Sequence, residues 1–438
     1  MFVTLSMARR AERFPDRTAL VDTSEERLYA PAETIHENRV TYGELAAIVD
    51  RTAQHLTALG IGAGDTVCLL TRNRVASLAI YFACRRLEAA FAPISHWLTP
   101  VTVERPFAVL DPDLVVSEAA QRDLVRSIPF DRSVTLEELA NADRAPISDE
   151  NGADHDGRDE PDGRSDDTRM PLAIFHGTEG RPVVGYTERT LEWNCISALL
   201  TWDLSRTDVA PLVAPLSSVA GLVRVALPLL YVGGTVLLDR AFDPGDTLTA
   251  IGDERATVLA GNPRPLEQLA AEPGFAEAAA SLDRTVVEHS MSDDARTRYR
   301  DAGVSLANAY GRLECPTALS QSFDAVDDDA TETASPVVGR PVVNCRARIV
   351  DDAGSVLAGE SEGELELSGS VVADGYVDPA GIADGNWTVS LERQREAVDN
   401  SGSGDESDEV DGDARLSDGW LHTEQSVRRT EDGDYQLR

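Results

Sequence analysis

The segment from Phe175 to Gly185, F-H-G-T-E-G-R-P-V-V-G, has residue types that suit phosphate chemistry. A glycine-rich turn with hydroxyl side chains can cradle phosphate oxygens with its backbone amides and hydroxyl groups. Gly177, Thr178 and Gly180 supply such groups, whereas Glu179 places an anion in the same turn. A surface loop between a strand and a helix that binds nothing would have a similar composition. The segment therefore indicates either a phosphate site or an ordinary loop, and both interpretations stay open.

Other reaction classes find little support in the chain. It contains no G-x-S-x-G turn, no H-E-x-x-H zinc motif and no G-x-x-x-x-G-K-[ST] phosphate loop. The five cysteines are widely spaced without a C-x-x-C pair, which predicts reduced core thiols rather than disulfides or zinc ligands. His176, His289 and His422 are far apart, and a lone histidine is more often a surface or capping residue than a ligand. Two short polar segments remain, Y-G-R-L-E from Tyr310 and W-L-H-T-E-Q from Trp420.

Alternating helices and strands must position these segments. Thr41 to Gly60 predicts a helix, since Thr41 and Glu44 form a capping box and Gly60 follows the last apolar turn. The apolar stretch from Leu212 to Leu238 contains Arg224 and a Gly-Gly pair, so it predicts a buried helix and a strand rather than a membrane span. Further strands are expected near Val67–Leu70, Val209, Thr235–Leu238, Thr257–Leu259, Thr285–Val287 and Ser305–Leu306, with helices at Ala76–Arg86, Pro265–Ala271 and Asp293–Ala302. This alternation favours an α/β fold with two parallel-sheet αβ layers and covering helices.

Acidic segments divide the chain. Residues 148–169 consist almost wholly of Asp, Glu, Gly, Arg and Ser, and they predict a disordered linker because they lack apolar surface to bury. Similar stretches occur at 327–333 and 395–417. We therefore expect a first αβ subregion at 1–147, a second at 170–335 containing the phosphate-loop-like segment, and a small β subregion at 336–438 with short strands and turns.

The chain has a large negative charge and no lysine. Its forty cationic residues are all arginine, against seventy-six Asp plus Glu, which gives a formal net charge of −36. Such a polyanion repels nucleic acids and anionic lipid surfaces, so neither is an expected partner. Molar salt reduces the Debye length to roughly 3 Å and relieves the self-repulsion. With an N-terminus that lacks a signal-peptide pattern, the composition favours a halophilic cytoplasm over an acidic mesophilic protein.

Several motifs, taken in order, resemble the adenylate-forming superfamily of acyl-CoA synthetases and aryl-CoA ligases. They run from R-V-T-Y-G-E-L at Arg39 and G-I-G-A-G-D-T-V at Gly60, through A-P-L-S-S-V-A-G-L at Ala214, L-P-L-L-Y-V-G-G-T-V-L-L at Leu227 and F-D-P at Phe242, to N-A-Y-G-R-L-E at Asn308, V-G-R-P at Val338, G-E-L-E-L-S-G at Gly363, G-Y-V-D-P at Gly375 and D-G-W-L-H-T at Asp418. No single string is decisive, but their order and spacing cover nearly the whole chain. The resemblance implies the large N-terminal domain of these enzymes.

The resemblance implies a reaction in two steps. A carboxylic acid, the small-molecule substrate, attacks the α-phosphate of ATP to give an acyl-adenylate, and a thiol such as coenzyme A then displaces AMP. It assigns the phosphates to Gly177, Thr178 and Gly180, and gives Thr178 a catalytic role. It assigns adenine to Tyr310 and Gly311, the ribose to Gln425, and both catalysis and Mg²⁺ to Glu314. Ser218 and Gly221 mark the acid pocket without defining its shape.

The chain also departs from the family pattern. Val183 stands at a phosphate-loop lysine, with Arg181 or Arg189 as substitutes for its charge, and Leu313 stands at a phosphate-contacting threonine. Gln425 replaces a ribose-binding aspartate, which removes charge assistance of roughly 1 kcal/mol or more. The family's small mobile domain, with its lysine, is not found before residue 438.

Two hypotheses follow from these departures. In the first, the chain is an ATP-dependent acid–CoA ligase of slow activity, completed by a separate C-terminal domain protein. In the second, it is a non-catalytic relative that binds AMP or an acyl ligand. The isolated chain is expected to adenylate slowly or not at all, because each lost contact removes transition-state stabilisation.

Overall fold

The computed structural model describes residues 5–23, 38–128, 130, 132–142, 170–323, 335–378, 388–389 and 415–438. The expected linker at 148–169, the stretch at 327–333 and most of the expected insertion at 395–417 lie outside this part. Residues Arg415–Ser417, the end of that insertion, form strand β21 and pair with β22. None of the helices in the described ranges is long and apolar enough to cross a membrane, as expected for the Leu212–Leu238 stretch.

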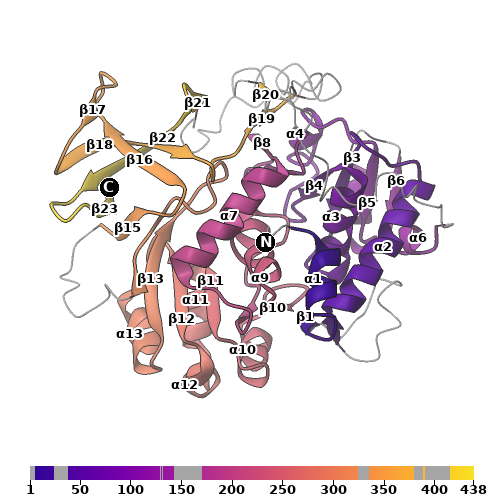
Figure 1. The fold of residues 1–438 in the computed structure, drawn as a ribbon, viewed down its shortest axis with the longest axis horizontal. Coiled ribbons are helices and arrows are strands. Elements are labelled where there is room, and N and C mark those ends of the chain that lie inside the picture. Colours follow the sequence, from indigo (N-terminus) through magenta and orange to yellow (C-terminus); the bar gives the residue numbers. More distant parts are fainter. Residues whose placement is uncertain are drawn as a thin grey trace.

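Three sheets form the framework, and Figure 1 shows how they are arranged. An eight-stranded sheet has the order β20 (Thr388–Val389), β19 (Gly375–Val377), β8 (Val183–Tyr186), β7 (Ala173–His176), β4 (Ala90–Ile94), β3 (Thr66–Leu70), β5 (Leu114–Ser117) and β6 (Ser133–Thr135). A four-stranded sheet has the order β2 (Arg39–Thr41), β1 (Thr18–Asp22), β10 (Thr235–Leu238) and β9 (Val209–Pro211). The strands from β7 to β6 and from β1 to β9 run parallel, as the alternation predicted.

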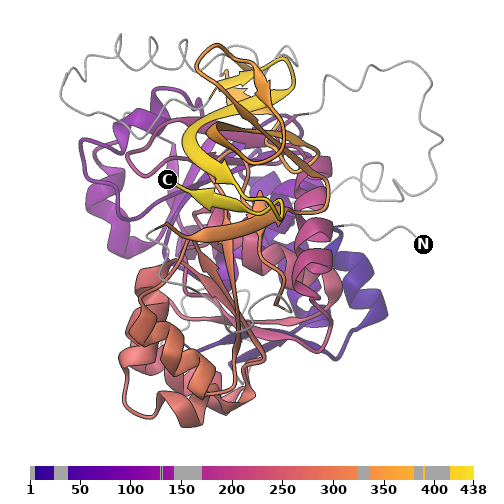
Figure 2. The ribbon, with the colours of Figure 1, turned by 90° about the vertical axis from the view of Figure 1, so that its left-hand side faces the viewer.

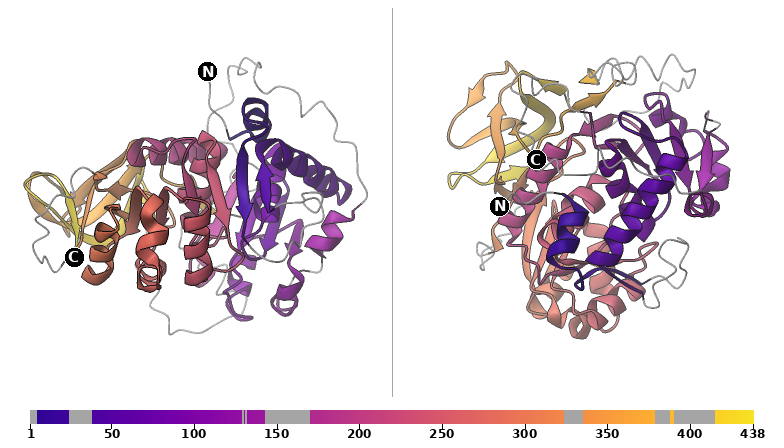
Figure 3. Two further views of the ribbon diagram at one scale, coloured as in Figure 1. Left: turned by 90° about the horizontal axis from the view of Figure 1, so that it is seen from below. Right: turned by 45° about the vertical axis from the view of Figure 1, so that its right-hand side comes forward.

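The third sheet joins the second αβ subregion to the C-terminal strands. Its order is β11 (Val258–Gly261), β12 (Arg284–Glu288), β13 (Ser305–Tyr310), β14 (Leu319–Ser320), β15 (Val337–Pro341), β23 (Tyr435–Leu437), β22 (Trp420–Arg429), β18 (Ser361–Gly369), β16 (Cys345–Val350) and β17 (Val356–Leu357). Strands β11 to β13 are parallel, and the later pairs are antiparallel. The view from below shows the C-terminal strands and the N-terminal αβ part at opposite ends of the molecule (Figure 3).

Helices cover these sheets. Around the first two sheets lie α1 (Met7–Arg13), α2 (Tyr42–Ala58), α3 (Val75–Leu87), α4 (Glu104–Phe107), α5 (Arg122–Val125), α6 (Leu136–Ala140), α7 (Glu188–Trp202), α8 (Val219–Gly221), the π-helical η4 (Leu222–Ala226) and α9 (Leu227–Val232). Beside β11–β13 lie α10 (Pro244–Asp253), α11 (Pro263–Ala271), α12 (Phe275–Ala278) and α13 (Asp293–Asp301), which Figure 2 shows below the C-terminal strands. Short 3₁₀ turns occur at η2 (Ala119–Gln121) and η5 (Ala279–Ser281).

Several secondary-structure elements that were predicted from short sequence patterns are present in the structure. Helix α2 has the predicted capping box, with Thr41 accepting from the Glu44 amide, and Gly60 follows it at a φ of +80°. The Leu212–Leu238 stretch forms α8, η4, α9 and β10. All five cysteines are buried and free. The sheets, however, do not follow the expected subregions: β1 pairs with β10, and β8 pairs with β19, because strand neighbours depend on packing between distant segments.

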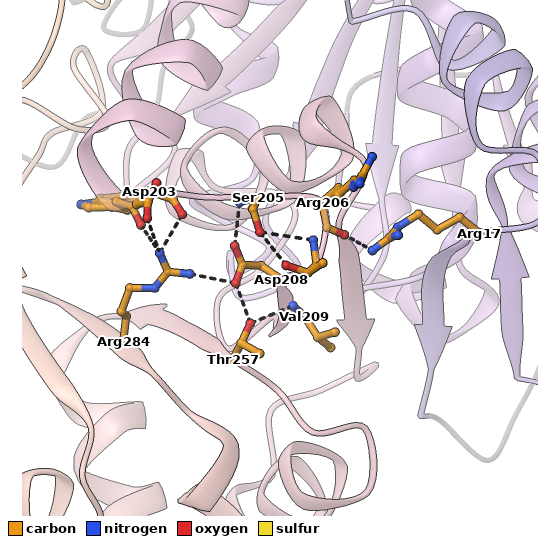
Figure 4. A network of polar contacts seen from close by, with 10 residues as sticks. Arg17, Asp203, Ser205, Arg206, Asp208, Val209, Thr257 and Arg284 are labelled. Carbon is orange, nitrogen blue, oxygen red and sulfur yellow. Dashed lines mark hydrogen bonds and ion pairs between the residues drawn. The ribbon is translucent and has the colours of Figure 1, made fainter.

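A polar network fixes the amino ends of three parallel strands (Figure 4). Asp208, just before β9, accepts from Arg284 Nη2 at 2.8 Å and from Thr257 Oγ1 at 2.8 Å. Arg284 Nη1 also donates to the carbonyl oxygens of Trp202 and Asp203. Asp208 is 4% exposed, and these hydrogen bonds satisfy its buried carboxylate. The opposite, carboxyl ends of these strands stay available for a ligand site, as is usual in α/β sheets.

Candidate functional site

The Y-G-R-L-E segment lies at the carboxyl end of β13. Tyr310 ends this strand and is 2% exposed, and the His289 ring lies 5.7 Å from its ring centre. Burial raises the pKa of the Tyr310 hydroxyl, against the opposing effect of Arg312 and Thr423 beside it. Gly311 has no room for a side chain, because a Cβ there would lie 2.0 Å from the Pro316 carbonyl oxygen. The close approach of these backbones explains why glycine stands at this position.

Glu314 is a buried carboxylate in the same segment. Its residue is 2% exposed, Tyr376 on β19 donates to Oε1 at 3.1 Å, and Arg312 Nε lies 3.9 Å from Oε2. Across the described ranges, three or more His, Cys, Asp or Glu side chains do not gather into a metal cluster. Mg²⁺ is commonly held by one or two carboxylates together with substrate phosphates. A single fixed carboxylate such as Glu314 therefore fits that ion.

Ser218 and Gly221 form the tight turn that starts α8. Ser218 Oγ donates to the Pro215 carbonyl at 2.8 Å and accepts from the Gly221 amide at 3.2 Å. A Cβ on Gly221 would lie 2.1 Å from the Pro215 oxygen. The first αβ subregion fixes this turn as well, since Asn73 Oδ1 accepts from the Leu216 amide at 2.7 Å. The Ser218 hydroxyl is thus a structural group of the turn.

The glycine-rich segment forms a loop between β7 and β8. The Gly177 amide donates to the Pro182 carbonyl, and the Gly180 amide donates to the Gly177 carbonyl, each at 2.9 Å. Gly180 has a φ of +87° and packs against α4, where a Cβ would lie 2.7 Å from the Thr102 oxygen. Thr178 and Glu179 are exposed at the tip. Two glycines therefore shape a loop whose tip presents one hydroxyl and one carboxylate.

An unexpected arginine accompanies the Glu179 carboxylate. Arg105 on α4 has an 11% exposed side chain, and its Nη1 lies 3.3 Å from the Glu179 carbonyl oxygen and 3.5 Å from Oε2. The sequence suggested Arg181 or Arg189 as the cation of this loop, and Arg105 was missed because it is 74 residues away. Val183, at the position of the family lysine, is fully buried in β8. A cation thus reaches the loop from α4.

In the third segment, W-L-H-T-E-Q, Thr423 lies near Tyr310, whereas the Gln425 side chain contacts other backbone groups. Thr423 lies beside the Tyr310 hydroxyl. The Gln425 side-chain amide instead donates to the backbone oxygens of Ser426 at 3.1 Å and Arg438 at 3.4 Å. In this structure the Gln425 amide thus contacts its own strand, β22, and the residue that follows the neighbouring strand β23.

Two residues that sequence reasoning did not single out connect the segments. Arg224 on η4 donates from Nη1 to Glu288 Oε2 at 2.8 Å and from Nε to the Pro316 carbonyl at 2.9 Å. Burial opposes the charge on Glu288, but Arg224, helped by His289, outweighs it and holds the pKa of Glu288 below its ordinary value. The Tyr186 hydroxyl, on the strand that leaves the glycine-rich loop, donates to the Leu313 carbonyl. The helical segment η4, the strand that leaves the glycine-rich loop and Y-G-R-L-E therefore meet around the end of β13.

Known proteins resemble this chain in sequence. The model of the family described as AMP-binding enzyme matches residues 7–377. A feruloyl-CoA synthase of Amycolatopsis sp is 30% identical over 342 residues, which cover 77% of this chain and 66% of that protein. An indoleacetate–CoA ligase of Aromatoleum aromaticum is 31% identical over 353 residues, covering 78% of this chain and 67% of the ligase. The chain thus spans about two thirds of the length of these relatives.

Solved structures share the fold. The N-terminal domain of FACL13 from Mycobacterium tuberculosis superimposes with a TM-score of 0.74 at 20% identity, over 99% of this chain and 98% of that chain. O-succinylbenzoate coenzyme A synthetase from Bacillus subtilis, in complex with AMP, gives 0.73 at 18% identity, over 99% and 97%. At these identities the likeness concerns the fold alone, and it agrees with the expected large N-terminal domain.

Proposed function

Because the chain belongs to the AMP-binding enzyme family, we propose that it binds ATP and a carboxylic acid, forms an acyl-adenylate, and passes the acyl group to the thiol of coenzyme A. The relatives named above are CoA synthases and ligases of aromatic acids, which supports this reaction class. The observation that carries the proposal is Glu314, a carboxylate buried at the end of a parallel strand and held by Tyr376. Adenylation was the first of the two hypotheses from the sequence.

The proposed roles of the residues are those that the family resemblance implies. Gly177, Thr178 and Gly180 bind phosphates, and Thr178 contributes its exposed hydroxyl. Tyr310 and Gly311 face the adenine and its sugar, and Ser218 and Gly221 border the acid. Gln425 contacts the ribose once its side-chain amide leaves the carbonyl oxygens of Ser426 and Arg438. Glu314 holds Mg²⁺, which supplies charge stabilisation at the phosphates when bound.

The anion in the loop requires an explanation under this proposal. An unpaired Glu179 would repel a triphosphate, but Arg105 lies within 3.5 Å of its carboxylate. The pair is partly exposed, and solvent screens its interaction. Arg105 thus reduces the repulsion between the Glu179 carboxylate and a bound phosphate.

The chain's environment is part of the proposal. We propose that it works in a cytoplasm rich in salt, since a formal net charge of −36 is best tolerated where repulsion is screened. A separate protein that supplies a further C-terminal domain remains a proposed partner. Nucleic acid is not, because the charge repels it.

Acid-dependent exchange of pyrophosphate into ATP tests the reaction. In 2 M KCl with ferulate or indoleacetate, we expect slow exchange that requires both acid and Mg²⁺. Glu314→Gln should lower its rate about 10²-fold or more, because one preorganised electrostatic contact is lost. Glu277→Gln, the same change on the exposed surface of α12, is the matched control and should leave the rate unchanged. Equal rates in the wild type and in Glu314→Gln would refute the assigned role.

A further inference from the structure

Arg224 is a buried cation that connects η4 to the residues just after Y-G-R-L-E. It lies on η4, directly after the Ser218–Gly221 turn, with a side chain that is 4% exposed. Its guanidinium contacts Glu288 at the end of β12 and the carbonyl oxygen of Pro316. The neighbouring residues of η4 and α9 are apolar, so Arg224 is the charged exception in this helical stretch.

Stability does not account for this arginine. A buried ion pair loses hydration on both partners, and replacement by apolar residues of similar volume is often neutral or stabilising. The Glu288 side chain is 18% exposed, so the pair lies at the border between the core and the site. A leucine or methionine at 224 would pack with its apolar neighbours without that cost. A role in binding explains the arginine better than a role in packing.

The guanidinium also has donors to spare. Arginine carries five N–H groups. Nε and one N–H of Nη2 are directed to the Pro316 carbonyl, and one N–H of Nη1 to Glu288. Within the part of the chain that the structure describes, these contacts use three donors, which leaves one on each Nη atom. Desolvated donors bind an acceptor more strongly than donors in water do.

One of these nitrogens, Nη2, lies against the proposed nucleotide segment. A Cβ on Gly311 would lie 2.4 Å from Arg224 Nη2, so the guanidinium fills the space that any larger residue at 311 would need. The η4 residues that include Arg224 directly follow the turn proposed to border the acid. An acid placed between the Ser218–Gly221 turn and Y-G-R-L-E would therefore lie between the two segments that Arg224 connects.

We propose that Arg224, oriented by Glu288, is the specificity residue of the acid site and selects acids with a neutral oxygen acceptor remote from the reacting carboxylate. This inference rests on the proposed function. The Arg224–Glu288 pair has no net charge, so a hydroxyl or alkoxy oxygen gains a hydrogen bond without charge repulsion. A second carboxylate would lose its hydration beside a pair that has no net charge, and an unsubstituted acid would leave the spare donors unsatisfied.

Binding of matched acids tests the inference. Calorimetry in 2 M KCl with saturating AMP compares 4-hydroxycinnamate, cinnamate and 4-carboxycinnamate. We expect the wild type to bind 4-hydroxycinnamate at least tenfold more tightly than either of the other two. Arg224→Met combined with Glu288→Gln removes both charges together, so no buried charge is left unpaired. This double variant should bring 4-hydroxycinnamate and cinnamate within twofold of each other, with Glu277→Gln as the control that keeps the wild-type ratio.

The outcomes separate this inference from the proposed function. Equal affinity of the wild type for the hydroxylated and plain acids, a ratio unchanged in the double variant, or no acid binding beside normal AMP binding would each overturn the inference. Acid discrimination without any AMP binding would support the inference and overturn the proposed function instead. If the double variant fails to give the circular dichroism spectrum of the wild type, Glu288→Gln alone is used, and an unchanged ratio there also counts against the inference.

Discussion

Breaking the buried ion pair between Arg74 and Glu118 should destabilise the protein strongly. Both side chains are 5% exposed or less, and Arg74 Nη2 lies 2.5 Å from Glu118 Oε1. After Arg74→Met, the hydrogen bonds left to Glu118 from described residues would be those of the Thr71 hydroxyl at 3.2 Å and the Arg72 amide at 3.4 Å. Removing one partner of a buried pair typically costs about 3–5 kcal/mol, because the remaining charge stays desolvated. We expect a loss in that range for Arg74→Met.

Urea unfolding in 2 M KCl, followed by circular dichroism, measures this loss, since urea leaves the ionic strength unchanged. Arg126→Met is the matched control, because Arg126 pairs with Asp123 at the surface with 70% and 97% of the side chains exposed. That pair should contribute less than about 1 kcal/mol. Adding Glu118→Gln to Arg74→Met should recover part of the stability by removing the unpaired charge. Equal losses for Arg74→Met and Arg126→Met would refute the reasoning.

The same pair predicts a pH dependence of defined sign. Burial opposes the charge on Glu118, but Arg74, together with the Arg72 amide and the Thr71 hydroxyl, outweighs it and holds the pKa of Glu118 below its ordinary value. A carboxyl with a lowered folded-state pKa stabilises the fold above its unfolded pKa, about 4.3 for Glu, and this contribution is lost as the pH falls further. The unfolding free energy of the wild type should therefore fall on acidification below about pH 4.3. In Arg74→Met the carboxyl is unpaired, so acidification should recover stability, and the opposite sign would contradict the account.

Three further predictions concern the turn near the acid and the surface charge. Asn73→Ala removes the hydrogen bonds to Leu216 at 2.7 Å and Ala214 at 3.3 Å, so it should cost about 1–3 kcal/mol in urea unfolding and weaken acid binding, and unchanged values for both would refute the link. Gly221→Ala should reduce acid-dependent exchange because its Cβ meets the Pro215 oxygen, whereas Gly62→Ala, with open space around it, should not; equal rates would count against this account of the turn. Lowering KCl from molar to millimolar should unfold the protein or broaden its transition in circular dichroism, and equal stability in both would contradict the halophilic interpretation.

The sequence predicted those features that depend on neighbouring residues. The capping box at Thr41 and the alternation of helices and strands act over a few residues, so the elements they specify appear in the structure. The order of strands was not predictable in the same way, because β1 pairs with β10 across more than two hundred residues. Sheet neighbours are chosen by packing of distant surfaces, which no short pattern records.

Some residues of the candidate site could likewise be predicted from short motifs, and others could not. Gly177, Gly180 and Gly311 were identifiable because a residue without a side chain stands out in a short motif, and each occupies a close backbone contact. The partners that give the site its charge were not identifiable, since Arg105 and Arg224 meet Glu179 and Glu288 only through the fold. Charged residues are common in a chain with this composition, so their pairing carries no local signal.

Titration of the protein with AMP tests the central claim most directly. In 2 M KCl, isothermal calorimetry should show one AMP bound per chain with a Kd in the millimolar range or tighter. Gly311→Ala should weaken this binding at least tenfold because its side chain meets Pro316 and Arg224, while Gly62→Ala should bind as the wild type does. A folded wild type that gives no binding heat with millimolar AMP at two temperatures would contradict the assignment of Tyr310, Gly311 and Glu314 to an adenine nucleotide.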